Sequence, residues 1–139
     1  MKHLTKMISA LFCLVMLTIG QQAAFAQTTA EIAGGNCKSC ADACQKTLDY
    51  CNTKKGKYGE ASVTNALKDC ITACKATSDF LNRGSAYLDQ KAAALTVDAC
   101  NNCAKSCDKF NTDNQMAACA NECRKAVGNL GKISSGAAK

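Results

Sequence analysis

The chain contains no proline and no tryptophan, and its single histidine is His3. The absence of proline excludes the C-x₂-C-x₂-C-x₃-C-P run that many iron–sulfur proteins use. Because no histidine follows position 3, the rest of the chain has no Ser/His/Asp set and no Cys/His pair, and no Gly-rich phosphate loop is present. These absences indicate a protein that is not an enzyme.

Large apolar side chains are also scarce, and alanine and cysteine fill much of the pattern expected to face the interior. A single domain that buries so little aliphatic area is only marginally stable from its core alone. We therefore expect bound metal or disulfide bonds to add stability.

The first 26 residues have the pattern of a secretory signal peptide. A basic start precedes an apolar run over 7–19, which is shorter than the roughly 20 residues of a transmembrane span. Residues 24–26 read Ala-Phe-Ala, the small residues that a signal peptidase recognises. We expect cleavage after Ala26 and a periplasmic or secreted protein with no membrane attachment.

The remaining residues, 27–139, carry 15 lysines and arginines against 11 aspartates and glutamates, a net charge of +4. This charge is mild and dispersed, so it does not indicate nucleic-acid binding. We expect the lysines to form a solvated helix surface. Met116 is the only thioether left after cleavage, and we expect it to pack in the core.

Apolar periodicity and capping residues predict four helices, at about 29–53, 60–82, 86–110 and 113–130. Gly84 suits a helix C-terminus and Ser85 the next N-cap, while Thr112 and Gln115 match a capping box. No strand pattern competes. Short loops then predict an all-α, up-down-up-down four-helix bundle over 27–131, followed by a flexible tail at 132–139.

The cysteines are spaced for helices. Cys13 lies in the leader, and eleven of the twelve cysteines follow it. They are Cys37, Cys40, Cys44, Cys51, Cys70, Cys74, Cys100, Cys103, Cys107, Cys119 and Cys123. Most steps are three, four or seven residues, so each cluster forms a stripe along one helix face.

Placing the helices head to tail brings these stripes together in one half of the bundle. We expect that half to open toward the loops at 54–59 and 111–112. We expect apolar side chains to close the other end. The inner stripe of the third helix is expected to contain Leu88, Ala92, Leu95, Ala99, Cys103 and Cys107. The closing residues are Ile32, Phe80, Leu81, Leu88, Leu95, Val127 and Leu130.

Disulfides are the first chemistry to consider, because an exported protein meets an oxidising compartment. Cysteines on one helix face have Cβ atoms about 5–6 Å apart, whereas a disulfide needs about 3.5–4.5 Å. Inter-helix pairs could close, but an odd number, eleven, leaves one thiol over. A helical domain stapled by inter-helix disulfides stays an alternative.

Metal binding is the second chemistry. The C-x-x-C steps at 37–40 and 100–103 could form one Cys₄ zinc site, which would leave seven cysteines unexplained. Cu(I) favours thiolate and thioether ligands, and bridging sulfurs let rows of thiols hold many ions. We therefore expect the eleven thiols to bind several Cu(I) ions.

Four cysteine-containing runs also resemble a known family: Cys-Lys-Ser-Cys-Ala-Asp-Ala-Cys at 37–44, Asp-Cys-Ile-Thr-Ala-Cys at 69–74, Cys-Asn-Asn-Cys-Ala-Lys-Ser-Cys at 100–107 and Cys-Ala-Asn-Glu-Cys-Arg-Lys at 119–125. They resemble the cysteine-rich four-helix-bundle copper-binding proteins of the copper storage protein family, as does Phe-Leu-Asn-Arg-Gly-Ser at 80–85. The resemblance implies core thiols that hold multiple Cu(I) ions, often in a homo-oligomer, in the service of copper homeostasis.

Two departures from the family pattern bear on capacity. Richly loaded members carry more cysteines on the second and fourth helices, whereas 75–82 and 125–130 have none here. Histidines that some relatives have near the bundle mouth are absent as well. A reduced copper capacity is therefore expected, and no motif identifies a copper donor or acceptor protein.

Overall fold

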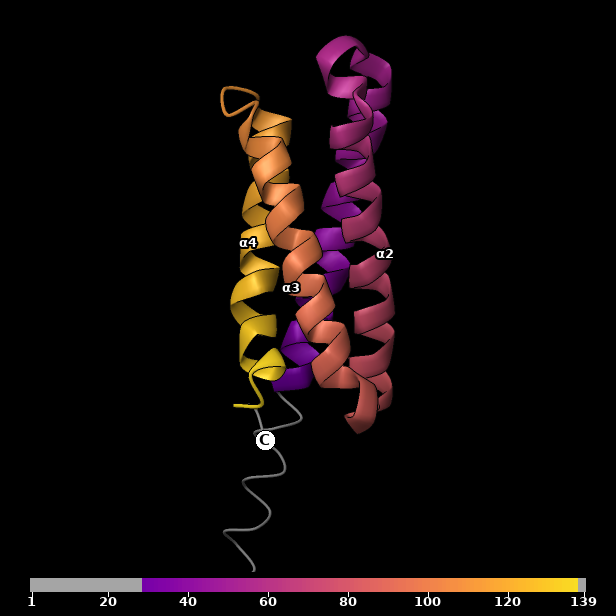
Figure 1. Ribbon diagram of the computed structural model, residues 1–139, viewed down its shortest axis with the longest axis vertical. Helices are drawn as coiled ribbons and strands as arrows, with labels where there is room; N and C mark the ends of the chain where they lie inside the picture. Colours follow the sequence, from indigo (N-terminus) through magenta and orange to yellow (C-terminus); the bar gives the residue numbers. More distant parts are fainter. Residues whose placement is uncertain (1–28, 138–139) are drawn as a thin grey trace, which may run out of the picture.

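The computed structural model describes residues 29–137, and this part of the chain is almost wholly helical (Figure 1). The first helix covers residues 29–54 and is followed by a short 3₁₀ helix, η1 (Gly56–Gly59). The other three helices are α2 (Ala61–Arg83), α3 (Ala86–Asp108) and α4 (Asn114–Ser134). The predicted leader lies outside the described residues.

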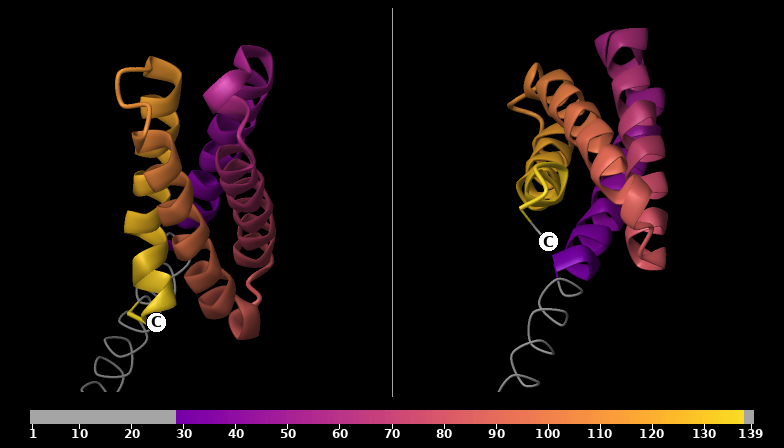
Figure 2. Two further views of the ribbon diagram at one scale, coloured as in Figure 1. Left: turned by 45° about the horizontal axis from the view of Figure 1, so that its top comes forward. Right: turned by 60° about the horizontal axis from the view of Figure 1, so that its bottom comes forward.

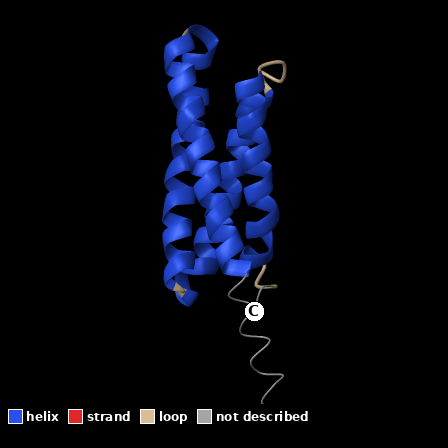
Figure 3. Cartoon of the chain, turned by 180° about the vertical axis from the view of Figure 1, so that it is seen from behind, coloured by secondary structure: helices blue, strands red, loops and turns tan. Residues whose placement is uncertain are grey.

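The four helices alternate in direction and form two hairpins. The first helix and α2 make one hairpin, and α3 and α4 make the other (Figure 2). Loops occur only at the ends of the described bundle (Figure 3), and α3 packs against both α2 and α4. The predicted up-down-up-down four-helix bundle is therefore confirmed.

The turn between α2 and α3 depends on Gly84. Its φ of 63° is left-handed, and its backbone N–H donates toward the carbonyls of Leu81 and Phe80. Glycine suits this position because it has no Cβ to clash in a left-handed conformation. The prediction for Gly84 is confirmed; Ser85 is the N-cap of α3, but its side chain makes no capping hydrogen bond.

The start of α4 differs from the prediction. Asp113, not Thr112, is the N-cap, and its carboxylate accepts from the backbone N–H groups of Gln115 and Met116 at 3.0 and 3.2 Å. A carboxylate also favours the positive end of the helix dipole, which explains why Asp113 takes the position. The Gln115 side chain donates instead to the hydroxyl of Thr47 at 2.9 Å.

The inner face of α3 also differs from the prediction. Leu88 and Leu95 are exposed, at 36% and 65% of their surface, whereas Ala93 and Thr96 are fully buried. Counting back from Cys100 by four and seven residues gives Thr96 and Ala93, so the cysteine stripe sets the buried face and turns the leucines outward.

The apolar end of the core is correspondingly smaller than expected. Leu81 and Leu130 are buried, but Ile32 is 52% exposed, and Phe80 and Val127 are only partly buried. Among the described residues, no helix is long and apolar enough to cross a membrane. An ion pair between Arg124 and Asp108, at 2.5 Å, joins α4 to the end of α3 on the surface.

Candidate metal centre

All eleven cysteines of the described chain point into the core, and each is 0% exposed. Every one is a free thiol. The shortest sulfur–sulfur separation, 3.5 Å, joins Cys44 to Cys119 and Cys70 to Cys100, whereas a disulfide bond is about 2.05 Å long. The alternative of a bundle stapled by disulfides therefore has no support among the described residues.

Eight of these thiols form three overlapping groups of four, in each of which all sulfurs lie within 4.8 Å of one another. The deep set is Cys40, Cys70, Cys74 and Cys100. The shallow set, nearer the loops at 54–59 and 111–112, is Cys44, Cys103, Cys119 and Cys123. The bridging set is Cys40, Cys44, Cys70 and Cys123. The deep and shallow sets share no cysteine, and the bridging set takes two from each.

The first helix supplies the centre of this arrangement. Cys44 Sγ lies 3.6 Å from Cys70, 3.8 Å from Cys103 and 3.7 Å from Cys123, which come from α2, α3 and α4. Cys40 makes the corresponding contacts one turn deeper, at 3.7 Å to Cys70 and 3.9 Å to Cys100. All four helices therefore contribute sulfur to one continuous column.

Three predicted site residues lie outside the groups of four: Cys37, Cys51 and Cys107. Cys51 is the cysteine of the first helix nearest the loop end, and its Sγ lies 3.7 Å from the Sδ of Met116. Met116 is 0% exposed, as expected for a core residue, but it also places a second soft donor beside this thiol.

Below the deep set, the sulfur column stops at a pair of threonines that sequence reasoning missed. The Thr77 and Thr96 hydroxyls are buried and lie 2.7 Å apart, and each lies 3.1 Å from a backbone carbonyl of the other's helix. Their two protons serve two of these three contacts at any time. Thr77 follows Cys74 by three residues and Thr96 precedes Cys100 by four, so the stripe spacing could have located them.

The sequence predicted that the opposite end of the column is open toward the loops, but in the structure aromatic side chains close it. Tyr58 stacks on Phe110 with ring centroids 4.5 Å apart, and Tyr50 meets Tyr58 edge-on at 6.0 Å. Asp113 accepts from the Tyr50 hydroxyl at 2.6 Å and from the Tyr58 hydroxyl at 3.2 Å. We call Tyr50, Tyr58 and Phe110 the aromatic cap.

Burial and contacts with neighbouring thiols shift the pKa values of the thiols. Burial raises the pKa of Cys51 to about 11, with further contributions from the neighbouring Cys119 and Asp113. The hydrogen bond to Cys100, with burial added, raises the pKa of Cys74 as well. These thiols hold their protons at neutral pH, so a metal ion that binds them releases protons as it does so.

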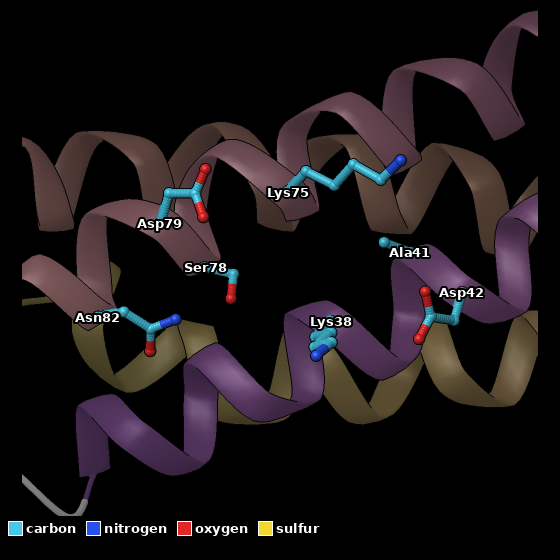
Figure 4. A pocket seen from close by; sticks show the side chains of 7 residues that line it. All are labelled: Lys38, Ala41, Asp42, Lys75, Ser78, Asp79 and Asn82. Atoms are coloured by element: carbon cyan, nitrogen blue, oxygen red, sulfur yellow. The ribbon is translucent and has the colours of Figure 1, made fainter.

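A groove on the surface between the first helix and α2 contains no sulfur (Figure 4). It is lined by Lys38, Ala41, Asp42, Lys75, Ser78, Asp79 and Asn82. Its charges are of both signs, and Ser78 donates to the carbonyl of Gly34 at 3.0 Å. The groove is separate from the sulfur column.

A protein-family model described as copper storage protein matches residues 24–134, which is most of the chain. The chain belongs to the copper storage protein family. No curated protein and no solved structure matches it.

Membership of the copper storage family fits the donor set. The groups of four consist only of buried sulfur, without a carboxylate or an imidazole among them. Soft ligands of this kind favour soft ions such as copper in its reduced state, whereas harder ions prefer oxygen ligands.

Proposed function

We propose that this protein stores or sequesters several Cu(I) ions, bound by thiolates of the bundle core. The observation that carries the proposal is the continuous column of eight fully buried thiols in overlapping groups of four. No enzymatic role is needed to account for it, since the family is one of copper storage.

Sharing of cysteines between the groups supports several ions rather than one. Each thiol of the bridging set also belongs to the deep or the shallow set, and thiolates can bridge two Cu(I) ions. Zinc is the competing cargo. A zinc ion takes four terminal ligands, and the deep and shallow sets, which share no cysteine, would supply two such sites.

Titration of the reduced protein with Cu(I), in competition with a chromogenic chelator and without oxygen, tests the proposal. We expect more Cu(I) than the two ions that separate groups of four could hold, and a parallel zinc titration should end at two or fewer. Binding of fewer than about two Cu(I) ions per chain would contradict the proposal, since clusters of soft ligands should take several.

Two serine variants test in the same titration whether the groups of four organise copper binding. Cys70→Ser removes a sulfur that belongs to two groups of four, and Cys37→Ser removes one that belongs to none. We expect Cys70→Ser to lower the number of tightly bound ions by at least one and Cys37→Ser to change it less. Equal losses would show that the groups do not organise binding.

We further propose that the protein acts in the periplasm or outside the cell, in copper homeostasis. The basic start, apolar run and Ala-Phe-Ala of the leader support export. The intact mass of the protein recovered from the periplasmic fraction should correspond to a chain that begins at Gln27. Full-length protein confined to the cytoplasm would contradict export. A homo-oligomer stays a prediction of the family resemblance.

A further inference from the structure

The loop end of the bundle carries a ring of exposed positive charge, which we call the basic rim. It consists of Lys54, Lys55, Lys57 and Lys109, all exposed. Lys54 is the last residue of the first helix, and Lys55 and Lys57 lie in the turn that follows it. Lys109 is the C-cap of α3, directly before Phe110. The function proposed above makes no use of these residues.

Two of the lysines are held over the aromatic cap. Lys54 Nζ lies 5.2 Å from the ring centroid of Tyr50 and 5.6 Å from that of Tyr58. Lys57 Nζ lies 5.7 Å from the Tyr58 centroid and 5.3 Å from that of Phe110. Ammonium groups within about 6 Å of ring faces gain cation–π attraction, so this geometry fixes positive charge above the end of the sulfur column.

The carboxylates near this end only partly offset the rim. Asp113 is occupied by the two tyrosine hydroxyls and two backbone N–H groups. Asp108 is paired with Arg124, and Asp49 accepts from Gln45. Glu60, exposed at the start of α2, is the remaining carboxylate. Four lysines therefore face three carboxylates that lack a cationic partner, Asp49, Asp113 and Glu60, and the net charge at the column's end is positive.

A positive field is unsuited to attracting a bare copper cation. Cu(I) binds soft ligands strongly, and its complexes with thiolates and similar donors carry negative charge. We propose that the basic rim recruits Cu(I) as small anionic soft-ligand complexes, from which the ion passes to the thiols beneath the aromatic cap. This inference rests on the proposed copper-storage function.

Cys51 lies directly beside the rim, since its carbonyl accepts from the backbone N–H of Lys55 at 2.9 Å. In the transfer, a bond from copper to the carrier ligand breaks and a bond from copper to the Cys51 sulfur forms. The thiol proton passes to the departing ligand or to solvent, and copper stays Cu(I) throughout. No oxidant or reductant is required.

A small complex fits this end better than a protein partner does. The rim occupies one tight turn and one helix end, whereas a specific protein interface covers about 800 Å² on each partner. Electrostatic attraction raises encounter rates and weakens with salt, because the screening length is about 10 Å at 0.1 M ionic strength.

The test is the rate of copper loading from two coloured donors of opposite charge, the anionic bis-bicinchoninate complex and the cationic bis-neocuproine complex of Cu(I). Stopped-flow absorbance follows loss of each colour, at donor concentrations where the rate is proportional to donor. The rim variant is Lys54→Gln with Lys57→Gln. The matched control is Lys75→Gln with Lys91→Gln, which removes the same charge and one cation–π contact, that of Lys91 over Tyr87 at 4.8 Å.

At low salt we expect the rim variant to load about three- to tenfold more slowly from the anionic donor, and the difference to shrink as salt is added. Loading from the cationic donor should stay the same or become faster, and the control should match the unmodified protein with both donors. A second rim variant, Lys55→Gln with Lys109→Gln, leaves the contacts over the cap intact and should act in the same direction.

The inference is overturned if both rim variants load from the anionic donor at the unmodified rate, if they slow both donors equally, or if the control slows as much. The number of ions bound at the end of each reaction separates the two proposals. A normal final number with no charge dependence overturns recruitment alone, whereas fewer than about two ions bound overturns storage itself.

Discussion

At Thr77 and Thr96, a hydroxyl oxygen in place of a sulfur determines where the sulfur column ends. They continue the cysteine stripes of α2 and α3, and the next sulfurs, Cys74 and Cys100, lie 3.6 Å apart. A threonine hydroxyl is a hard donor that Cu(I) binds poorly, so the column ends where oxygen replaces sulfur.

Changing both threonines to cysteine should therefore lengthen the column. Thr77→Cys with Thr96→Cys adds two sulfurs about one helical turn, or 5.4 Å, below the deep set. We expect at least one more tightly bound Cu(I) ion in the chelator titration. Thr77→Val with Thr96→Val is the control and should bind the unmodified number. An unchanged number in the cysteine variant would show that the threonines do not set the column's length.

At the scale of the helices, the features that depend on the spacing of nearby residues could be predicted from the sequence. The four helices, the glycine between α2 and α3 and the inward face of the cysteines all follow from the 3.6-residue period and from capping. The prediction for the inner face of α3 is wrong in the first half of the helix. The predicted stripe continues from Cys103 and Cys107 to Leu95 and Leu88, whereas the buried face continues through Cys100 to Thr96 and Ala93.

Contacts between distant segments could not be predicted. The closed loop end depends on Tyr50 and Tyr58 meeting Asp113, which lies 63 and 55 residues further along the chain. No local sequence pattern predicts such a contact, because the contact forms only when two separate hairpins pack side by side. The buried thiol groups could be predicted, because every helix carries its own stripe of cysteines.

Two leucines give a direct test of which helix faces form the core. Leu130 of α4 is 0% exposed, so Leu130→Ala should lower the free energy of unfolding by about 2–4 kcal/mol. Leu95 of α3 is 65% exposed, and Leu95→Ala should change it by less than about 0.5 kcal/mol. Urea unfolding of the metal-free, reduced proteins measures both. A large loss in Leu95→Ala would mean that this face is covered in solution.

At the scale of the whole molecule, the core contains few large apolar side chains. Leu67, Met116, Leu130 and Val63 are the largest side chains that are fully buried, and cysteine and alanine occupy most of the remaining core. A protonated, buried cysteine contributes little more to stability than a small apolar side chain does. Much of the stability of the loaded protein should then come from its cargo.

Copper loading should accordingly raise the melting temperature. Each site at 100 times its dissociation constant adds about 2.7 kcal/mol, so several sites should raise the midpoint by about 10 °C or more. Circular dichroism under anaerobic conditions, at increasing copper-to-protein ratios, follows the change. Cys70→Ser should gain less than the unmodified protein. A melting temperature that stays constant while copper binds would show that the metal-free bundle is already fully organised.

The complete burial of the thiols also affects how long a bound ion stays in the protein. Water reaches none of the eleven sulfurs, and the aromatic cap covers the end of the column nearest the loops. If the column holds copper as proposed and the ion leaves by that end, its residence time depends on how often Tyr58 and Phe110 separate as well as on the strength of its bonds to sulfur. Two proteins with equal affinity for copper can thus differ widely in how long they retain it.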